Sequence, residues 1–279
     1  MTLTQTLAIG DIRLSALRDG ELSFVPSQFP DAPPDEVDGL MLQAGVSSLP
    51  SAINAYLIQV AGRTTLVDCG PRDLFGPGAG RLHTALAECG VAAADIDRIV
   101  ITHLHGDHIA GAVDASGDAV FGNAELCVHQ ADHDHYTSDI NRARAPDASR
   151  RGFDLARQVI DAYGARYTTY TDNTDFGHGV FAMPLPGHTP GHAGLRLDSG
   201  GDAVLLVADI VHCQLLQLGR PEWGTVFDVD RDRAAATRAR LLDQLASERV
   251  LFSGSHFERH PLGYLVRGLQ GYRFEALGD

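Results

Sequence analysis

The stretch that most constrains this chain is residues 101–111, which read ITHLHGDHIAG. It places three imidazoles and a carboxylate within six positions, namely His103, His105, Asp107 and His108. The stretch follows the apolar run RIVIT (98–102), which predicts a short buried strand. Burying an imidazole costs free energy unless its nitrogens find partners, so four such groups together require water or a positive ion.

The spacing inside this stretch favours two metal ions. Side chains two apart in an extended chain point the same way, so His103 and His105 can reach one point. Asp107 and His108 are neighbours, and a turn at Gly106 would aim them at a second point. On a helix, residues two apart would diverge by about 200°, which excludes the helical HExxH arrangement. The alternative is a polar loop with solvated histidines.

Three other places put ligand-type side chains where a predicted strand meets a loop. The Gly- and Pro-rich turn 185–192 carries His188 and His192; we expect one to be a ligand and leave open whether the other supports it or only caps the turn. Asp209 ends the run AVLLVAD and His256 follows VLFSG, although singly they could cap a loop or bond a carbonyl. Strand exits are where α/β sheets place their sites. None of these places contains a cysteine, so the ligands would be histidine nitrogens and carboxylate oxygens. Such a set favours Zn²⁺, Mn²⁺ or Fe over a thiolate-bound metal.

The charge and cysteine content exclude several classes of partner. The formal charge of −14, from 22 basic and 36 acidic residues, argues against a nucleic-acid partner and against anionic membrane surfaces. No apolar run approaches the roughly 18 residues of a membrane helix. The four cysteines are scattered without a CxxC pair, which is typical of reduced thiols in a cytoplasmic protein.

The order of elements predicts an α/β layered fold with mixed sheets and a single domain over residues 1–279. We expect a hairpin turning at 61–63. Strands are predicted at 98–102, 125–129, 180–185, 193–198, 203–209 and 250–254, and helices at 81–89, 150–163 and 232–246. The Pro-rich residues 25–50 predict a surface excursion without regular structure and, as a hypothesis, the contact of a homodimer.

The pattern HxHxDH, then His, Asp and His, over residues 103–256 resembles the metallo-β-lactamase superfamily across nearly the whole chain. The resemblance implies an αββα sandwich, in which two mixed sheets flanked by helices hold a dinuclear site at one edge. It assigns His103, His105 and His188 to one ion, Asp107, His108 and His256 to the other, and Asp209 to both. It also implies that Asp68, in LVDCG, supports the metal ligands.

Within the superfamily, four stretches resemble the branch of methyl parathion hydrolase and the quorum-quenching lactonases: VDCGPRDLFGPGAGRL, ITHLHGDHIAG, PGHTPGH and GYRF. The resemblance implies that Phe75 and Tyr136 line an apolar substrate mouth. Acyl-homoserine lactonases of the better-known type carry a tyrosine three residues after the bridging aspartate, whereas this chain has His212 there. An imidazole can donate the same hydrogen bond to a substrate carbonyl.

Together these observations predict a metal-dependent hydrolase that cleaves a lactone or carboxylic ester of apolar or aromatic character. The nucleophile would be a hydroxide shared by two divalent ions, Zn²⁺ in the first place. Asp107 is expected to orient that hydroxide and pass its proton, with His212 or Tyr136 assisting the oxyanion. A phosphotriester hydrolase is the nearest alternative, and a non-catalytic metal-binding protein of the same fold is the second.

We expect the substrate pocket to be apolar and aromatic. The candidates are Phe75, Tyr136, His212, Leu215, Leu216, Trp223 and Phe227. For Leu215 and Leu216, the hydrophobic core is the stronger alternative. Trp223, between Glu222 and Gly224, is expected at the surface or at the pocket mouth.

Overall fold

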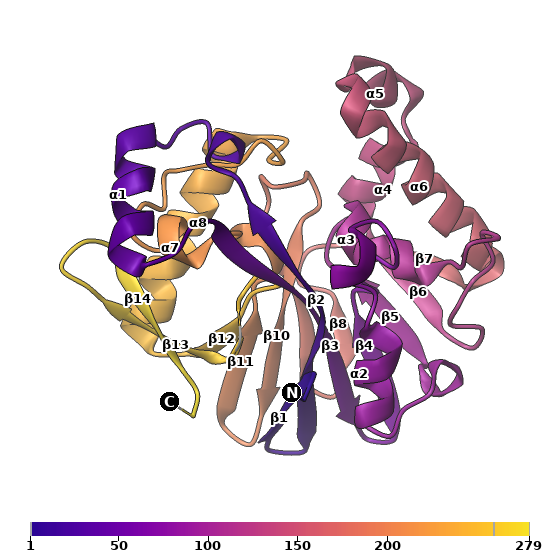
Figure 1. Ribbon diagram of the computed structural model, residues 1–279. Helices are drawn as coiled ribbons and strands as arrows, with labels where there is room; N and C mark the ends of the chain where they lie inside the picture. The colour runs from indigo at the N-terminus through magenta and orange to yellow at the C-terminus, as the bar shows by residue number, and fades with distance from the viewer. Residues whose placement is uncertain (1, 259, 279) are drawn as a thin grey trace.

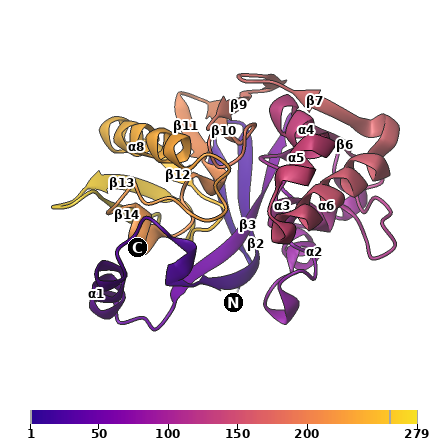
Figure 2. The same cartoon turned by 90° about the horizontal axis from the view of Figure 1, so that it is seen from above.

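Two seven-stranded sheets pack face to face in the computed structural model, which describes residues 2–258 and 260–278. Helices cover the outer face of each sheet, so the layers run helix, sheet, sheet, helix (Figures 1 and 2). This is the αββα sandwich that the sequence predicts.

Strands from residues 4–170 form one sheet, and strands from residues 175–276 form the other. The first sheet contains β1 (Thr4–Ile9), β2 (Ile12–Phe24), β3 (Leu49–Val60), β4 (Arg63–Val67), β5 (Arg98–Ile101), β6 (Glu125–His129) and β7 (Tyr167–Tyr170), in that order. The second contains β8 (Asp175–Gly177), β9 (Val180–Pro184), β10 (Ala193–Ser199), β11 (Asp202–Leu206), β12 (Leu251–Ser253), β13 (Gly263–Arg267) and β14 (Tyr272–Ala276), also in sequence order.

The helices are α1 (Pro34–Ala44), α2 (Leu82–Glu88), α3 (Gly106–Ile109), α4 (Gln130–Thr137), α5 (Asp139–Arg144), α6 (Asp147–Tyr163), α7 (Gln214–Gln217) and α8 (Arg231–Glu248). The helices α2 to α6 lie on the side of the first sheet, and α1, α7 and α8 lie on the other side (Figures 1 and 2). None of the helices in the described ranges is long and apolar enough to cross a membrane.

Strands buried on both faces build the layers. On β5, Ile99 packs in the cluster shared with α2 and α6, whereas Val100 packs between the two sheets. On β11, Leu205 packs with α8, whereas Val204 packs between the sheets. Because successive side chains of a strand point to opposite faces, an unbroken apolar run fills two layers at once.

Both sheets are mixed, and their parallel strand pairs position the predicted ligands. The pairs β4–β5 and β11–β12 are parallel. Asp68 follows β4 and His103 lies just beyond β5, while Asp209 and His256 lie just beyond β11 and β12. Parallel strands end on the same edge of a sheet, which brings segments far apart in the chain to one place.

The prediction of an irregular excursion over residues 25–50 is wrong in its middle part, because Pro34–Ala44 forms α1 and β3 begins at Leu49. The prolines there do not break the helix: Pro33 is the N-cap and Pro34 the first helical residue, where a missing N–H costs nothing. Gly45 ends the helix at a φ of 67°. The homodimer contact proposed for this segment stays a prediction.

The other predicted elements are confirmed within a few residues. The hairpin β3–β4 turns at Ala61 and Gly62, and α2, α6 and α8 lie where helices are predicted. The predicted strand 203–209 ends earlier, at Leu206, and Asp209 lies in a short 3-10 turn. That turn directs the Asp209 carboxylate out of the sheet and toward the histidines.

Candidate metal centre

Three histidine rings from two loops converge on one point. His103 and His105 lie in the loop between β5 and α3, and His188 lies in the turn between β9 and β10. His105 Nδ1 lies 3.1 Å from His103 Nε2 and 2.9 Å from His188 Nε2, and the two Nε2 atoms are 3.2 Å apart. Nitrogens this close need a shared cation or shared protons.

Burial decides between these possibilities. It holds the pKa of His103 well below its ordinary value and lowers the pKa of His105 to about 3. The rings of His103 and His105 are therefore neutral near pH 7, and converging imidazole nitrogens match the ligand set of a divalent ion such as Zn²⁺.

A second cluster adjoins the first and contains two carboxylates. Its members are Asp107 and His108 on α3, Asp209 after β11, and His256 after β12. His256 Nε2 lies 2.9 Å from Asp209 Oδ2 and 3.5 Å from Asp107 Oδ2, and His108 Nε2 lies 3.3 Å from Asp209 Oδ2.

Asp209 lies between the two clusters. Its Oδ2 is 3.8 Å from His103 Nε2 and 3.7 Å from His188 Nε2, in addition to its contacts in the second cluster. Its Oδ1 is buried and has no hydrogen-bond partner among the residues described. A buried carboxylate oxygen without a donor is costly, so this position also fits a cation.

The electrostatics of the second cluster fit a divalent ion. Burial is the largest single effect and would lower the pKa of His108 and of His256, but the nearby carboxylates, Asp209 first and then Asp107, together outweigh it and raise both. Burial alone would raise the pKa of Asp107 and of Asp209, but the two imidazoles lower both. Two protons on the rings balance the two carboxylates, and one divalent cation could replace them.

Asp68 fixes one ring of the second cluster, as predicted. Its Oδ2 accepts hydrogen bonds from His108 Nδ1 and from the Thr102 hydroxyl, each at 2.8 Å, and its Oδ1 accepts from the Thr102 amide at 2.8 Å. Asp68 adopts a φ of 61°, a left-handed conformation that aspartate tolerates better than most residues. With Nδ1 donating to a carboxylate, Nε2 of His108 is free to bind a metal.

The structure separates the roles of His188 and His192. His192 Nδ1 donates to the carbonyl of Leu185 at 2.7 Å, and its Nε2 accepts from the amide of Asp209 at 3.0 Å. Both nitrogens are therefore used, and His192 supports the Asp209 backbone while His188 belongs to the first cluster.

The sequence analysis missed two buried carboxylates. Asp132 on α4 accepts hydrogen bonds from the Leu104 amide and the Thr189 hydroxyl, and so links the two loops of the first cluster. Asp228 accepts a hydrogen bond from His188 Nδ1 at 2.8 Å. Neither ends a predicted strand. Asp228 stands between the apolar residues Phe227 and Val229, which is a weak local signal, whereas Asp132 lies in a polar stretch that gives none.

His212, the predicted catalytic imidazole, lies against the second cluster. Its Nε2 is 3.4 Å from Asp209 Oδ2, and its ring stacks on the rings of His256 and Phe227. Burial and the nearby His188 hold the pKa of His212 well below its ordinary value, so the ring is neutral. Its Nδ1 has no partner within the described part of the chain.

Tyr136 and the loop of Phe75 lie near the segment that carries His105 and Asp107. Tyr136, on α4, is buried, with its ring edge toward His105 at 6.3 Å between centroids. Phe75 is 49% exposed. The preceding residue, Leu74, reaches Gly106, which places this loop beside the helix that carries Asp107.

The expectation that Trp223 lies at the surface is wrong: it is 4% exposed, in an apolar cluster that also holds Leu216 and Phe24. Its backbone carbonyl accepts hydrogen bonds from Gln217 and Arg238, which draw the loop inward. Leu216 is fully buried, in line with the core alternative. These residues lie behind Phe24, whose ring contacts His212, and their role in substrate binding stays a prediction.

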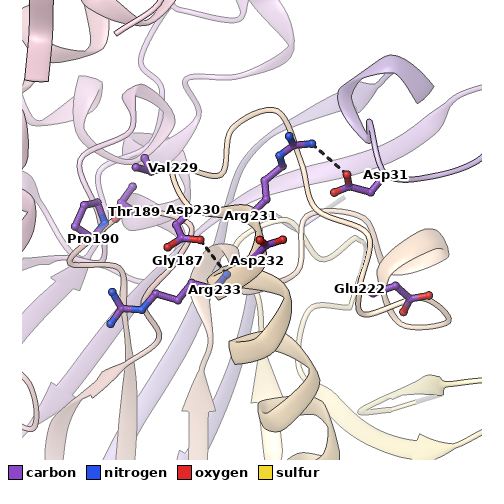
Figure 3. Close-up of a pocket in the computed structure, with 10 residues that line it drawn as sticks. All are labelled: Asp31, Gly187, Thr189, Pro190, Glu222, Val229, Asp230, Arg231, Asp232 and Arg233. Atoms are coloured by element: carbon purple, nitrogen blue, oxygen red, sulfur yellow. Dashed lines mark hydrogen bonds and ion pairs between the residues drawn. The ribbon is translucent and has the colours of Figure 1, made fainter. Parts of the chain in front are cut away.

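A polar depression of about 660 Å³ lies on the outer side of the His188 turn (Figure 3). Its lining includes Gly187 and Thr189, but not His188. Arg231 pairs there with Asp31 at 3.1 Å. Since none of the lining residues belongs to either cluster, the depression is separate from the candidate metal centre.

Comparison with known proteins identifies the family. The model of the metallo-beta-lactamase superfamily matches residues 49–256, and the chain belongs to this superfamily. Its sequence is 31% identical over 166 residues to the protein named "Probable metallo-hydrolase Rv2300c" of Mycobacterium tuberculosis, which covers 58% of this chain and 52% of that protein. The chain thus spans about half the length of this relative.

Two solved structures match the whole fold. The hydrolase AbOPH of the beta lactamase superfamily is 26% identical with a TM-score of 0.93, over 100% of this chain and 99% of that chain. AidC, described as a dizinc quorum-quenching lactonase in complex with a product, N-hexnoyl-L-homoserine, is 25% identical with a TM-score of 0.92 over the same shares. The predicted superfamily is confirmed, and the predicted lactonase resemblance has a structural counterpart in AidC.

Proposed function

We propose that this chain, as one domain over residues 1–279, is a dinuclear metal-dependent hydrolase that opens a lactone or cleaves a carboxylic ester. The observation that carries the proposal is the pair of adjoining ligand clusters, His103, His105 and His188 in one and Asp107, His108, Asp209 and His256 in the other. Asp209 Oδ2 faces both clusters and would serve both ions.

The ligand set supports Zn²⁺ first, with Mn²⁺ or Fe as alternatives, because it contains imidazoles and carboxylates but no thiolate. When bound, such ions supply Lewis acidity and bring the pKa of a coordinated water toward neutrality.

Asp107 is the group we assign to proton transfer. Its side chain is 17% exposed, whereas those of His108, Asp209 and His256 are 1–2% exposed, so Asp107 is the member of the second cluster that substrate and solvent can reach. The pKa of Asp107 is lowered overall, against the effect of burial, so it is an ionised acceptor near neutral pH. It would orient the attacking water, accept its proton and deliver that proton to the leaving group.

His212 and Tyr136 are the groups we assign to the developing oxyanion. His212 is neutral, buried and adjacent to Asp209, so it can present an N–H to a substrate oxygen held at that edge of the site. Burial raises the pKa of the Tyr136 phenol well above its ordinary value, which keeps it a hydrogen-bond donor.

A carbonyl substrate with an apolar or aromatic part fits these surroundings best. Phe227, 37% exposed, stacks on His212, and Phe75 is exposed in the loop whose Leu74 reaches Gly106, next to Asp107. The lactonase AidC, solved with its product N-hexnoyl-L-homoserine, supports the same substrate class. Phosphotriester hydrolysis remains the second candidate because the same ligand set can polarise a phosphoryl oxygen.

The test is metal content by plasma mass spectrometry on the preparation screened against an acyl-homoserine lactone, an aryl ester and an aryl phosphotriester. We expect two ions per chain and chelator-sensitive turnover, fastest on a lactone or ester. The matched variant is His103→Ala combined with Asp209→Ala, which should lose both metal and turnover. Unchanged metal content and turnover in that variant would overturn the proposal. Two ions with turnover only on the phosphotriester would favour the second candidate, and metal without turnover would favour a binding protein.

A further inference from the structure

We propose that Asp228 is a positioning residue of the first metal cluster and that Arg238, on α8, holds Asp228 in place. The inference rests on the proposed function, because it concerns the ring of His188. It arises from a buried ion pair: the side chains of Arg238 and Asp228 are both fully buried, with Arg238 Nη2 3.7 Å from Asp228 Oδ2.

The Asp228 carboxylate is anchored on both oxygens. Oδ1 accepts the hydrogen bond from His188 Nδ1 at 2.8 Å, and Oδ2 accepts from the amide of Thr225 at 2.8 Å. The positive charge of Arg238 balances the negative charge of the carboxylate. A buried carboxylate is stable only with such partners.

The backbone that follows Asp228 is hydrogen-bonded to the turn that carries His188. The amide of Val229 donates to the carbonyl of His188, and that of Asp230 donates to the carbonyl of Gly187, each at 2.9 Å. Gly187 has a φ of 131°, and a Cβ there would collide with the backbone of Ala234 in the first turn of α8. The start of α8 therefore lies directly against the His188 turn, as Figure 3 shows from the outer side.

The hydrogen bond to Asp228 determines which nitrogen of His188 can bind a metal. With the proton held on Nδ1, the lone pair of Nε2 points at His103 and His105. A carboxylate partner also makes the imidazole a more basic ligand. By contrast, Nδ1 of His103 faces the hydroxyl of Thr102, a weaker partner.

Arg238 connects this arrangement to the rest of the site. Its guanidinium donates to the carbonyls of Ile210, Pro221 and Trp223. These carbonyls lie in the segment that runs from Asp209, the ligand shared by the two clusters, to Asp228. The guanidinium thus holds this segment near both of its ends, at Ile210 and at Asp228. This role accounts for the full burial of an arginine that lies far along the chain from every predicted ligand.

The test measures zinc affinity by competition with a chromophoric chelator, in wild type, Asp228→Ala and Asp228→Asn. We expect two zinc ions in wild type and a loss of about 10- to 100-fold in the affinity of one of them in Asp228→Ala. Asp228→Asn, which keeps one acceptor oxygen, should fall in between. Cobalt-loaded Asp228→Ala should show an altered visible spectrum, which a change in overall stability alone would not cause.

Asp172→Ala is the matched control, because Asp172 also contacts a histidine, His129 at 3.1 Å, but lies outside both clusters. It should leave zinc affinity unchanged. Arg238→Met tests the second half of the proposal: its effect on zinc affinity should be several-fold smaller in the Asp228→Ala background than in wild type. If Arg238→Met does not fold, Arg238→Lys takes its place in the same comparison.

The outcomes separate the two proposals. Two zinc ions bound equally tightly by wild type and Asp228→Ala would overturn the positioning role and leave the proposed function intact. A wild type that binds no zinc would overturn both. Equal effects of the Arg238 substitution in the two backgrounds would overturn the role of Arg238 alone.

Discussion

The carboxylate of Asp132 accepts a hydrogen bond from the backbone amide of Leu104 at 3.0 Å, although the two residues are 28 positions apart. Leu104 lies between His103 and His105, and Asp132 also accepts from the Thr189 hydroxyl at 2.9 Å, next to His188. A single carboxylate therefore joins the two loops on which the first metal position depends.

Asp132→Asn should destabilise the protein. The carboxylate accepts three hydrogen bonds, the third from the Gly191 amide, and an asparagine must turn its NH₂ group toward at least one of these donors. A buried unsatisfied donor costs about 1–3 kcal/mol, which urea unfolding of the metal-free protein would detect. Asp134→Asn, on the exposed side of the same helix, is the control and should change stability by less than about 0.5 kcal/mol. Equal stability of the two variants would contradict the role of Asp132.

The metal-free protein should lose stability as the pH falls from 7 to 5, in part through His192. Burial lowers the pKa of His192 to about 3, against an ordinary value of 6.5, so below pH 6.5 the unfolded chain binds a proton that the folded protein does not. Stability therefore falls with decreasing pH, by about 1.4 kcal/mol per pH unit for each such group.

His192→Gln should make that pH dependence shallower by about one proton, because glutamine can replace the bonds to Leu185 and Asp209 without titrating. Chemical unfolding of the chelator-treated protein at pH 7, 6 and 5 measures the slope. His178→Gln, at an exposed position, should leave the slope unchanged. A slope that is the same in His192→Gln and wild type would show that His192 is not the group that titrates.

Zinc binding should release protons near neutral pH. The nearby carboxylates, Asp209 first and then Asp107, together outweigh burial and raise the pKa of His108 and of His256, so both rings carry protons that a metal must displace. Zinc affinity should therefore fall as the pH is lowered. Calorimetric titration in two buffers of different ionisation enthalpy gives the number of protons released, and His256→Asn should release fewer. Heats that do not depend on the buffer would rule out this protonated state.

His212→Phe should separate catalysis from metal binding. Because His212 is not one of the seven ligands proposed for the two ions, metal content should stay at the wild-type value while kcat falls by about 10²–10³-fold on the best substrate of the panel. His212→Tyr should retain part of the activity through its hydroxyl. Phe227→Leu, which changes the ring stacked on His212, should raise KM more than it lowers kcat. Full activity of His212→Phe would remove this residue from the mechanism.

The sequence by itself determined the layered fold and the identity of the clustered ligand candidates. Apolar runs such as the one before His103 predict strands buried on both faces, and the spacing of His103, His105, Asp107 and His108 is a local property of six residues. Strand exits in α/β sheets meet at one edge, so Asp209 and His256 could be expected near the same place.

Only the tertiary structure decided between residues whose local patterns are alike. His188 and His192 stand four apart in one turn, and their hydrogen-bond partners distinguish them. The Asp209 amide donates to His192, whereas His188 donates to the Asp228 carboxylate. Asp228 is 40 residues from His188 along the chain, and the periodic spacing of apolar residues within helices and strands predicts no contact over that separation. Likewise, Trp223 between polar neighbours is buried because Gln217 and Arg238 draw its backbone inward. A local sequence pattern reflects the secondary structure of its own segment. The roles of His188 and Asp228 and the burial of Trp223 depend instead on packing between segments that are distant along the chain and meet only in the folded protein.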